Sequence, residues 1–341
     1  MPTSSPVSVI LCTCNRSAAL RQTLEALGRV RIPRDWNVEL IVVDNASTDD
    51  TAIIVKNATL ERMEVRYLHE PRKGKCHALN AGLALARGEF ILFTDDDVLP
   101  SEEWLEESVA PMLNDSCDAM TGHLILAPHL MRPWLTDGHK MLLALSLDAQ
   151  SRDWSRELIG ATMGFRRAVL ERVPGFDPEL GPGPDALGFC EDTIFGWQVA
   201  QAGFRIEHVP KAVAIHQLNV SRLERRNWLG DATKRGRTQA YLRYHWKHDD
   251  IRFPWFKSLA YSMKLRLRRA LQPPPPLEGE GCPLWEISYV MHMEMCRQFC
   301  LERHRPRNYS RRGLTKRVLS KCPTGRVDDG RVEEAIGRIS R

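Results

Sequence analysis

Three consecutive aspartates, Asp95 to Asp97, follow the apolar run 89–94 and are the residues whose types and spacing most clearly suggest chemistry. The run is short and rich in aromatic and branched side chains, so it predicts a buried strand that ends in concentrated negative charge. Two like charges about 4 Å apart repel by about 4 kcal/mol at an effective dielectric constant of about 20, and a bound cation would offset that repulsion. Carboxylate oxygens suit Mg²⁺ or Mn²⁺ shared with substrate phosphates. The alternative is a solvated acidic turn before a helix that begins near Ser101.

A fourth carboxylate, Asp44, ends the apolar run 38–43. A carboxylate that follows a buried strand can accept hydrogen bonds from a nucleobase or a ribose. It can equally begin an Asx-turn that leads into the next helix. The sequence leaves both roles open.

A basic segment, Arg72-Lys73-Gly74-Lys75, opens a helix predicted over residues 74–86. Helix N-termini favour anions and lysines add to that attraction, so the segment can hold a diphosphate; the alternative is a solvated basic turn. The chain has no Walker glycine loop and no Gly-x-Gly-x-x-Gly after a strand. This absence argues against a P-loop enzyme and against a nicotinamide dehydrogenase.

An acidic pair, Glu191-Asp192, precedes a helix predicted over residues 193–201. The helix dipole favours acids at this position, so capping is one interpretation. The other is a general base, because a neighbouring carboxylate and an apolar wall raise the pKa of a carboxyl group toward the useful range. His216 ends the apolar run 212–215 and could complete metal coordination as a neutral imidazole, although a single histidine at a strand end is more often structural.

Alternating strands and helices must position these groups. Strands are predicted at 7–12, 38–43, 65–68 and 89–94, with intervening helices at 17–28 (capped by Ser17), from Asp49 or Asp50 to 60, and at 74–86. Strands and helices joined by short links predict a doubly wound α/β sheet. In such sheets ligands bind outside the carboxyl ends of the strands, where Asp44 and Asp95 to Asp97 fall.

The pattern becomes mixed after Pro111. Short strands or loops are predicted at 118–122 and 160–165, a short helix at 166–173, and two strands at 204–209 and 212–216 that pair with each other. Helices are predicted at 222–247 and 253–271, with a stiff proline break at 273–276. Residues beyond Pro323 are predicted to be loose.

The composition is that of a soluble globular protein, with 43% hydrophobic and 27% charged residues among 341. No apolar run reaches about 18 residues and no signal peptide is visible, so a cytoplasmic location is expected. The nine cysteines lack a framework spacing, which fits reduced thiols. Residues 1–221 hold 21 Lys and Arg against 30 Asp and Glu, whereas residues 222–341 hold 27 against 13, so an acidic body precedes a basic region.

Several segments, in the same order, resemble a family 2 glycosyltransferase with the GT-A fold over about residues 7–220. They are Val9–Arg16, Val42–Asp49, Lys73–Gly82, Phe93–Asp97, Gly164–Arg167, Gly175–Asp177, Glu191-Asp192 with Ala202–Ile206, and Val209-Pro210 with His216. The chain departs from the family pattern at Cys14 and at Phe189-Cys190, where a glycine usually precedes the acidic pair. The resemblance implies a mixed α/β sheet flanked by helices over residues 1–221. A basic, mostly helical extension would follow over residues 222–341.

The resemblance also implies a reaction: inverting, metal-dependent transfer of a sugar from a nucleotide-diphospho-sugar to an acceptor hydroxyl. Asp192 would be the catalytic base and Glu191 would support it by hydrogen bonding. Mg²⁺ or Mn²⁺ would be held by Asp97, Asp95 and His216. The residues expected to bind the nucleotide-sugar are Thr13, Asn15, Arg16, Asp44, Lys75, Asp95 and Asp96.

The expected partners are a nucleotide-sugar donor, with UDP favoured, and a saccharide or lipid-linked acceptor, as in bacterial-type polysaccharide, lipid-linked glycan or glycolipid synthesis. The segment 255–271 mixes aromatics, leucines and cations, so peripheral contact at the inner face of a membrane is one expectation and packing on the catalytic domain is the other. Nucleic acid is not expected, because no binding motif accompanies the basic charge. The alternative functions are a sugar-nucleotide nucleotidyltransferase and a non-catalytic nucleotide-sugar-binding protein.

Overall fold

An eight-stranded mixed sheet forms the centre of the computed structural model, which describes residues 5–146, 157–310 and 313–314. The strands lie in the order β3-β2-β1-β4-β7-β6-β8-β5. Their bounds are β1 Ser5–Thr13, β2 Trp36–Asp44, β3 Glu64–His69, β4 Phe90–Asp95, β5 Val98–Pro100, β6 Ala119–Leu126, β7 Met163–Arg166 and β8 Ile206–His216. A small second sheet pairs β9, Tyr309–Ser310, with β10, Gly313–Leu314.

Strands β1 to β4 are parallel to one another, as predicted. Their side chains alternate between two cores, because successive residues of a strand point to opposite faces. In β1, Val9 and Leu11 enter the core on one face, and Ile10 enters the core on the other. Apolar burial on both faces explains why these strands are nearly continuous in apolar residues.

The other half of the sheet is mixed. β7 is antiparallel to both β4 and β6, β8 is parallel to β6, and β5 is antiparallel to β8. The prediction of two strands pairing at 204–209 and 212–216 is wrong, because β8 is one continuous strand. Pro210 has no backbone N–H, and the register with β6 shifts there, so that Gly122 pairs with Val209 and His123 with Val213. The apparent turn is therefore a bulge.

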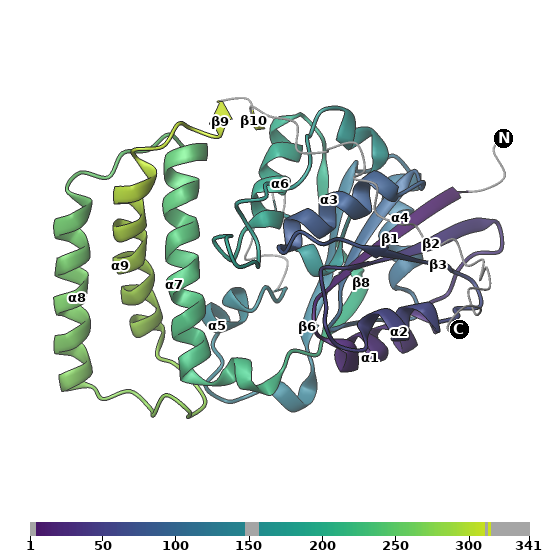
Figure 1. The fold of residues 1–341 in the computed structure, drawn as a ribbon. Coiled ribbons are helices and arrows are strands. Elements are labelled where there is room, and N and C mark those ends of the chain that lie inside the picture. Colours follow the sequence, from purple (N-terminus) through teal and green to yellow (C-terminus); the bar gives the residue numbers. More distant parts are fainter. Residues whose placement is uncertain (1–4, 147–156, 311–312, 315–341) are drawn as a thin grey trace, which may run out of the picture.

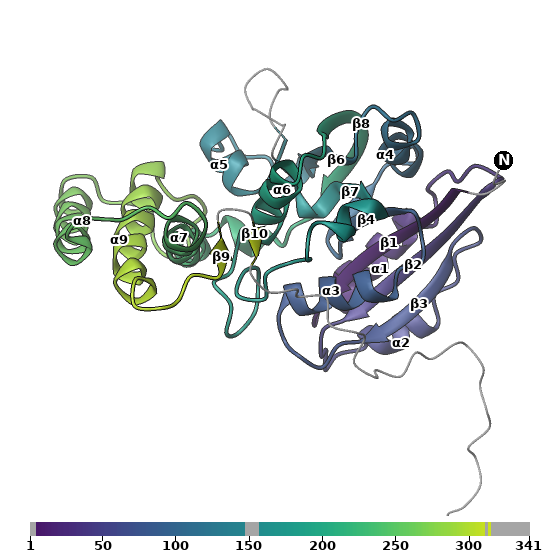
Figure 2. The ribbon, with the colours of Figure 1, turned by 90° about the horizontal axis from the view of Figure 1, so that it is seen from above.

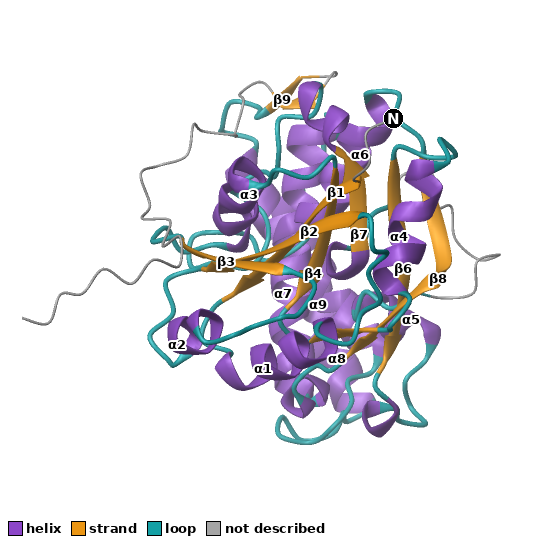
Figure 3. Ribbon diagram, turned by 90° about the vertical axis from the view of Figure 1, so that its right-hand side faces the viewer, coloured by secondary structure: helices purple, strands orange, loops and turns teal. Residues whose placement is uncertain are grey.

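Helices cover both faces of the sheet. Figure 3 shows α3 on one side of β1 to β3, with α1 and α2 on the other side. The helices are α1 Ser17–Leu27, α2 Thr51–Lys56, α3 Lys75–Leu85, α4 Trp104–Leu113, α5 Asp137–Leu142, α6 Glu191–Gln201, α7 Arg225–Tyr241, α8 Pro254–Leu271 and α9 Leu284–Glu302. A 3₁₀ helix, Arg167–Glu171, replaces the short helix predicted at 166–173, and a π-helical turn, Leu242–Trp246, extends α7.

Two helix ends differ from the predictions, and one helix was not predicted. Ser17 does not cap α1: the cap position is Arg16, and the backbone N–H of Ser17 donates to Asp49. α2 ends at Lys56 rather than near residue 60, with Asn57 as its C-cap. The helix α9 had no counterpart in the sequence prediction, and the predicted loose segment beyond Pro323 lies outside the described residues.

The helices α7, α9 and α8 lie side by side as a layer next to the sheet, with α8 outermost (Figures 1 and 2). Trp228 of α7 packs edge-on against Trp134 and His139, at ring distances of 6.3 and 5.3 Å. The layer is thus joined to the sheet region through a shared core. Among the helices of the described residues, none is long and apolar enough to cross a membrane.

Candidate active site

The predicted site residues meet at the carboxyl edge of the parallel strands. β1 and β2 end side by side, with Thr13 opposite Asp44, and Cys12 of β1 lies opposite Asp95 of β4. Parallel strands present their carboxyl ends at one edge, so the residues that follow them share it. At this edge, each aspartate of the 95–97 run contacts a different set of side chains.

Asp96 is buried and binds the turn after β1. Thr13 Oγ1 donates to Asp96 Oδ2 at 2.8 Å, and Arg16 Nη1 donates to Asp96 Oδ1 at 2.6 Å. Burial raises the pKa of Asp96 to about 6, although the charge of Arg16 acts against that rise. Both oxygens of Asp96 therefore have partners within the chain, and Asp96 fixes the positions of Thr13 and Arg16.

Asp97 lies between a guanidinium and an imidazole. Arg16 Nη1 is 2.9 Å from its Oδ2 and His216 Nε2 is 3.5 Å from its Oδ1. The pairing of β5 with β8 brings them together, because Val98 lies opposite His216. Burial alone would raise the pKa of Asp97, but the hydrogen bond and charge of His216 and the charge of Arg16 hold it below its ordinary value.

Asp95 is paired with Lys75, the first residue of α3. Lys75 Nζ is 2.8 Å from Asp95 Oδ1 and 3.5 Å from Glu191 Oε1 at the start of α6. Burial would lower the pKa of Lys75, but the charges of Asp95 and Glu191 outweigh burial and hold it well above its ordinary value. Burial, opposed by Lys75 and reinforced by Asp192, raises the pKa of Glu191 to about 7.

Asp192 is held by backbone amides. The N–H of Gly160 donates to Asp192 Oδ2 at 2.9 Å, and the N–H of Thr193 donates to Oδ1 at 2.7 Å. The preceding residue, Cys190, has a left-handed backbone with φ of 68°. This turn begins α6 with its two acids at the N-terminus, where the helix dipole favours negative charge.

Asp44 is buried and both of its oxygens have partners. The N–H of Ser47 donates to Oδ1 at 2.8 Å, and the Tyr67 hydroxyl donates to Oδ2 at 2.7 Å. Asp44 therefore orders the turn after β2, which fits the structural alternative; its contact with a nucleoside stays a prediction. Asn15 joins the turns after β1 and β2, because its Oδ1 accepts from the Thr48 N–H at 2.7 Å.

The predicted residues form two neighbouring clusters. One contains Arg16, Asp97 and His216, and the other contains Lys75, Asp95 and Glu191. Asp95 and Asp97 are two residues apart, so at most about 7 Å separates their Cα atoms. A set of polar side chains thus extends from His216 to the acidic pair.

Whether the site can bind a divalent cation depends on which side chains could coordinate it. Within the described ranges, no group of three or more His, Cys, Asp or Glu side chains lies close enough together to enclose a metal ion. Asp97 and His216 are adjacent. The carboxylate oxygen of Asp97 suits Mn²⁺ or Mg²⁺, whereas the imidazole nitrogen of His216 suits a transition metal such as Mn²⁺ better than Mg²⁺. Asp95 contacts Lys75 instead. These side chains fit a metal that completes its coordination with substrate oxygens.

Several residues that support the site were not among the predicted site residues. Asn45 holds the entry to α3, with its Oδ1 accepting from the Gly74 N–H at 2.7 Å and its Nδ2 donating to the Arg72 carbonyl at 2.6 Å. Tyr241 and Tyr309, far along the chain, both donate to Asp177 Oδ2. An Asx-turn pattern could have indicated Asn45, but no local pattern indicates a contact between residues 177 and 309.

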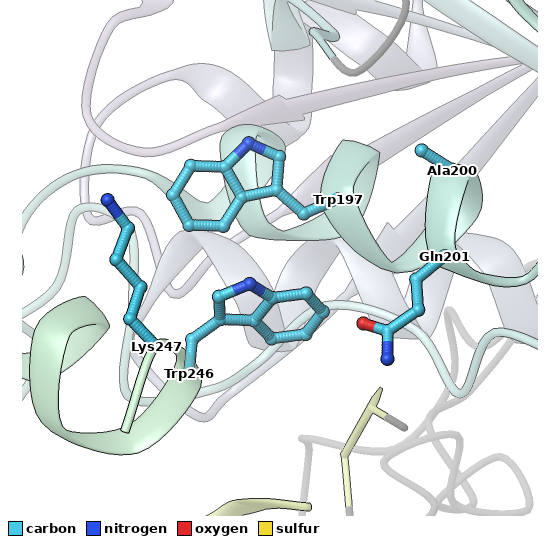
Figure 4. Close-up of a pocket in the computed structure, with 5 residues that line it drawn as sticks. All are labelled: Trp197, Ala200, Gln201, Trp246 and Lys247. Atoms are coloured by element: carbon cyan, nitrogen blue, oxygen red, sulfur yellow. The ribbon is translucent and has the colours of Figure 1, made fainter. Parts of the chain in front are cut away.

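A separate pocket of about 540 Å³ lies on the flank of α6 (Figure 4). Trp197 and Trp246 face each other across it, with ring centroids 5.9 Å apart, and Lys247 lies 5.6 Å from the Trp197 ring. Its lining, within the described part of the chain, includes none of the predicted site residues. Trp197 therefore belongs to this pocket and to the packing of α6 on the π-helical turn.

A family model and the curated relatives that match this sequence all point to glycosyltransferases. Residues 8–173 match the model of the family described as glycosyl transferase family 2. A pre-mycofactocin glycosyltransferase from Mycobacterium tuberculosis is 26% identical over 242 residues, covering 67% of this chain and 45% of the relative. The probable glycosyltransferase YdaM from Bacillus subtilis is 27% identical over 221 residues, covering 62% and 50%. The chain thus spans about half the length of these curated relatives.

A solved structure supports the same fold. The mannosyltransferase PcManGT from Pyrobaculum calidifontis, in complex with GDP-Man and Mn²⁺, is similar with a TM-score of 0.60 and 21% identity, covering 87% of this chain and 88% of that chain. A likeness at this identity shows the fold, and the predicted GT-A architecture is confirmed. Residues 8–173 therefore match glycosyl transferase family 2, and the fold of the described residues agrees with that match.

Proposed function

We propose that the protein is an inverting, metal-dependent glycosyltransferase that moves a sugar from a nucleotide-diphospho-sugar to an acceptor hydroxyl. The observation that carries the proposal is the meeting of Asp97, His216, Lys75 and the acidic pair at one edge of a GT-A sheet. The match to family 2 and the GDP-Man complex of PcManGT support the class of donor. The donor nucleotide is UDP, GDP or dTDP, and the family resemblance favours UDP.

The donor would lie across the carboxyl ends of β1, β2 and β4. Thr13, Asn15 and Arg16 form one wall, and Asp44 closes the nucleoside end. Asp96 is buried with both oxygens bonded, so we assign it the positioning of Thr13 and Arg16 rather than direct contact with the donor. Lys75 would face the diphosphate, because it is the first residue of α3 and helix N-termini favour anions.

The residues that would hold a divalent cation are Asp97 and His216, with Asp95 close by. When bound, Mn²⁺ or Mg²⁺ would neutralise charge on the leaving diphosphate. Arg16 and Lys75 place fixed positive charge on the same side, and fixed charges stabilise developing negative charge without reorganisation.

Asp192 would act as the catalytic base. Gly160 and Thr193 amides hold its carboxylate in one orientation, which positions an acceptor hydroxyl for proton transfer. As the hydroxyl oxygen bonds to the anomeric carbon, its proton moves to Asp192. The bond from that carbon to the diphosphate oxygen breaks and the nucleoside diphosphate leaves with the electron pair. A single displacement of this kind inverts the anomeric configuration.

Glu191 would link the base to the donor side. Its carboxyl group is 3.5 Å from Lys75, and its raised pKa of about 7 leaves it partly protonated at neutral pH. A partly protonated carboxyl can donate a hydrogen bond as well as accept one. We assign Glu191 the positioning of Lys75 and of the start of α6.

The acceptor is proposed to be a saccharide or a lipid-linked saccharide, with the protein working in the cytoplasm or at the inner face of a membrane. Residues 1–221 would carry the catalytic site, and residues 222–341 would be a basic extension with its proline break at 273–276. The layer of α7 to α9 supports such an extension, although it shares core contacts with the sheet region.

The test is a thermal-shift screen with UDP, GDP and dTDP, with and without Mn²⁺, followed by turnover of the matching nucleotide-sugar. Asp192→Asn should lower turnover by about 10²–10⁴-fold and leave the nucleotide-dependent shift in melting temperature unchanged. Asp185→Asn, an exposed position on the loop before the acidic pair, is the matched control and should behave as wild type.

Other outcomes distinguish the alternatives. Equal nucleotide-sugar hydrolysis by wild type and Asp192→Asn would remove Asp192 as the base. Binding of nucleotide-sugar without any turnover would favour a non-catalytic binding protein. Release of pyrophosphate from a nucleoside triphosphate and a sugar phosphate would favour a nucleotidyltransferase.

A further inference from the structure

The outer face of α8 carries a row of exposed large apolar side chains. Phe256, Leu259, Met263, Leu267 and Leu271 follow one another at intervals of three or four residues, so they form a single stripe along the helix. These side chains are between 47% and 73% exposed. Figure 2 shows that the helix lies at the edge of the molecule, farthest from the sheet.

The opposite face of α8 fixes the orientation of this stripe. Leu265 is buried against α9, and the Ser258 hydroxyl donates to the Met293 carbonyl at 3.1 Å. Arg269 Nε donates to Glu286 at 2.6 Å, and the ring of Tyr261 stacks on His292 at 5.1 Å. Because polar and aromatic contacts hold the inner face, α8 cannot turn its apolar stripe toward the protein.

Cations flank the stripe and no acid interrupts it. None of the 18 residues of α8 is Asp or Glu. On a helical projection with 100° per residue, Lys257 and Lys264 fall on one side of the stripe and Arg266 on the other, and all three are exposed. Long cationic side chains beside an apolar face can extend toward phosphate groups while their methylene stems lie on the apolar surface.

We propose that the apolar stripe of α8 with its flanking cations docks the protein on an anionic lipid bilayer, with α8 lying parallel to the membrane surface. Helices that combine a strongly charged flank with aromatic and leucine side chains bind in the interfacial region of bilayers. Attraction of the three flanking cations to anionic headgroups adds to the burial of the stripe. Trp255 and Phe256, at the N-terminal end of the helix, suit the headgroup level.

A second copy of the chain fits this surface less well. Two α8 stripes packed face to face would bring Lys257, Lys264 and Arg266 of both copies together, and like charges repel. Elsewhere in the described residues, the exposed large apolar side chains are dispersed over different elements, as with Ile53 on α2, Ile125 on β6 and Met141 on α5. They form no stripe that matches α8.

This inference deepens the membrane contact proposed above and rests on it, but its test requires no catalytic turnover. Full-length protein is floated on a density gradient with vesicles of phosphatidylcholine and phosphatidylglycerol, and with phosphatidylcholine alone. The wild type should float with the anionic vesicles at low ionic strength and less at high ionic strength, because salt screens the cations. A failure to float leaves the glycosyl-transfer proposal intact, and a failure of turnover leaves this one intact.

Two variants locate the binding surface. The triple variant Phe256→Ser, Met263→Ser, Leu267→Ser removes the stripe, and its control, Ile53→Ser, Met141→Ser, Leu301→Ser, removes apolar side chains that are at least half exposed elsewhere. The charge variant Lys257→Gln, Lys264→Gln, Arg266→Gln should bind about 100-fold more weakly than wild type. Its control is Arg21→Gln, Arg29→Gln, Arg34→Gln, which changes the net charge by the same amount at exposed positions.

The stripe variant should stay at the bottom of the gradient while both controls float. Wild-type protein that does not float with anionic vesicles, or a stripe variant that floats as well as wild type, would overturn the proposal. A dimer that the stripe variant converts to a monomer, with no flotation of the wild type, would assign the surface to a second copy instead.

Discussion

Glu191 and Asp192 are consecutive, yet their surroundings give them different properties. The Asp192 carboxylate accepts two backbone N–H groups, whereas Glu191 is buried beside Lys75 and has its pKa raised to about 7. In the proposed mechanism, the acid held by oriented amides is the base, and the partly protonated acid is a positioning residue. Spacing alone treats the two acids as a pair.

Glu191 should make stability depend on pH. Its pKa is higher in the folded chain than the ordinary value of 4.5, so the folded state holds a proton that the unfolded state releases, and stability falls as pH rises from about 4.5 through 7. Glu191→Gln removes this ionisation. Without metal or nucleotide, its melting temperature relative to wild type should rise between pH 5 and pH 8, by the equivalent of roughly 1–3 kcal/mol.

Glu280→Gln is the control for this prediction. Glu280 is paired with Arg132, which holds the pKa of Glu280 below its ordinary value, so its contribution is constant above pH 5. Melting curves at several pH values measure the difference. A melting-temperature difference between Glu191→Gln and wild type that stays constant from pH 5 to pH 8 would contradict the assignment.

His216 should control the response to metal. Since its Nε2 faces Asp97 Oδ1, removal of the imidazole leaves Asp97 without its neighbouring nitrogen donor. His216→Ala should weaken Mn²⁺ binding in the presence of nucleoside diphosphate at least tenfold, while the shift caused by nucleotide alone persists. Titration of Mn²⁺ in the thermal-shift assay measures the effect, and the exposed His129→Ala is the control. Unchanged Mn²⁺ dependence would exclude His216 as a ligand.

At the scale of elements, the loop between Asp177 and Cys190 delivers the acidic pair to the site, and the C-terminal region holds that loop. Tyr241 of α7 donates to the buried Asp177 at 2.6 Å, and Thr238 donates to the Leu187 carbonyl at 3.3 Å. The guanidinium of Arg235 lies 4.0 Å from the centre of the Phe189 ring. The position of α6 is therefore set by α7, a helix that begins more than twenty residues after α6 ends.

Tyr241→Phe should test this dependence. Loss of the hydroxyl removes one donor from a buried carboxylate, which costs about 1–3 kcal/mol of stability. It should also reduce kcat several-fold with little change in KM for the donor, because α6 carries the proposed base and the proposed donor contacts lie on other elements. Tyr244→Phe, whose hydroxyl bonds to the exposed 303–305 segment, is the matched control. An effect on stability alone would restrict Tyr241 to a structural role.

At the scale of the whole molecule, the charge boundary near residue 221 is not a boundary in the packing. Trp228 lies in the same core as the first strands, and Arg225 forms a buried pair with Glu286 at 2.6 Å. A chain ending at residue 221 should expose this core and lose cooperative folding or melt at a markedly lower temperature. A chain ending at residue 314, which keeps α7 to α9, is the control. Equal melting temperatures for the chain ending at residue 221 and the wild type would establish two independent domains.

The parallel half of the sheet and the edge that carries the site could be predicted from sequence because their signals are local. Apolar runs define β1, β2 and β4, and the aspartates follow them directly. The partners of those aspartates could not be predicted in this way. Arg16, Lys75 and His216 come from three different elements, and only the strand order brings them to Asp95, Asp96 and Asp97.

The sequence by itself determined the class of fold, the family and the side chains that gather at the strand ends, since periodicity and short motifs record local preferences and chemistry. The tertiary structure alone decided which cationic side chain pairs with each of Asp95 to Asp97 and that Glu191 is the partly protonated acid. It also decided that one face of α8 stays exposed to solvent. Those properties depend on burial and on contacts between residues far apart in the chain. Burial and long-range contacts arise only when the layers pack.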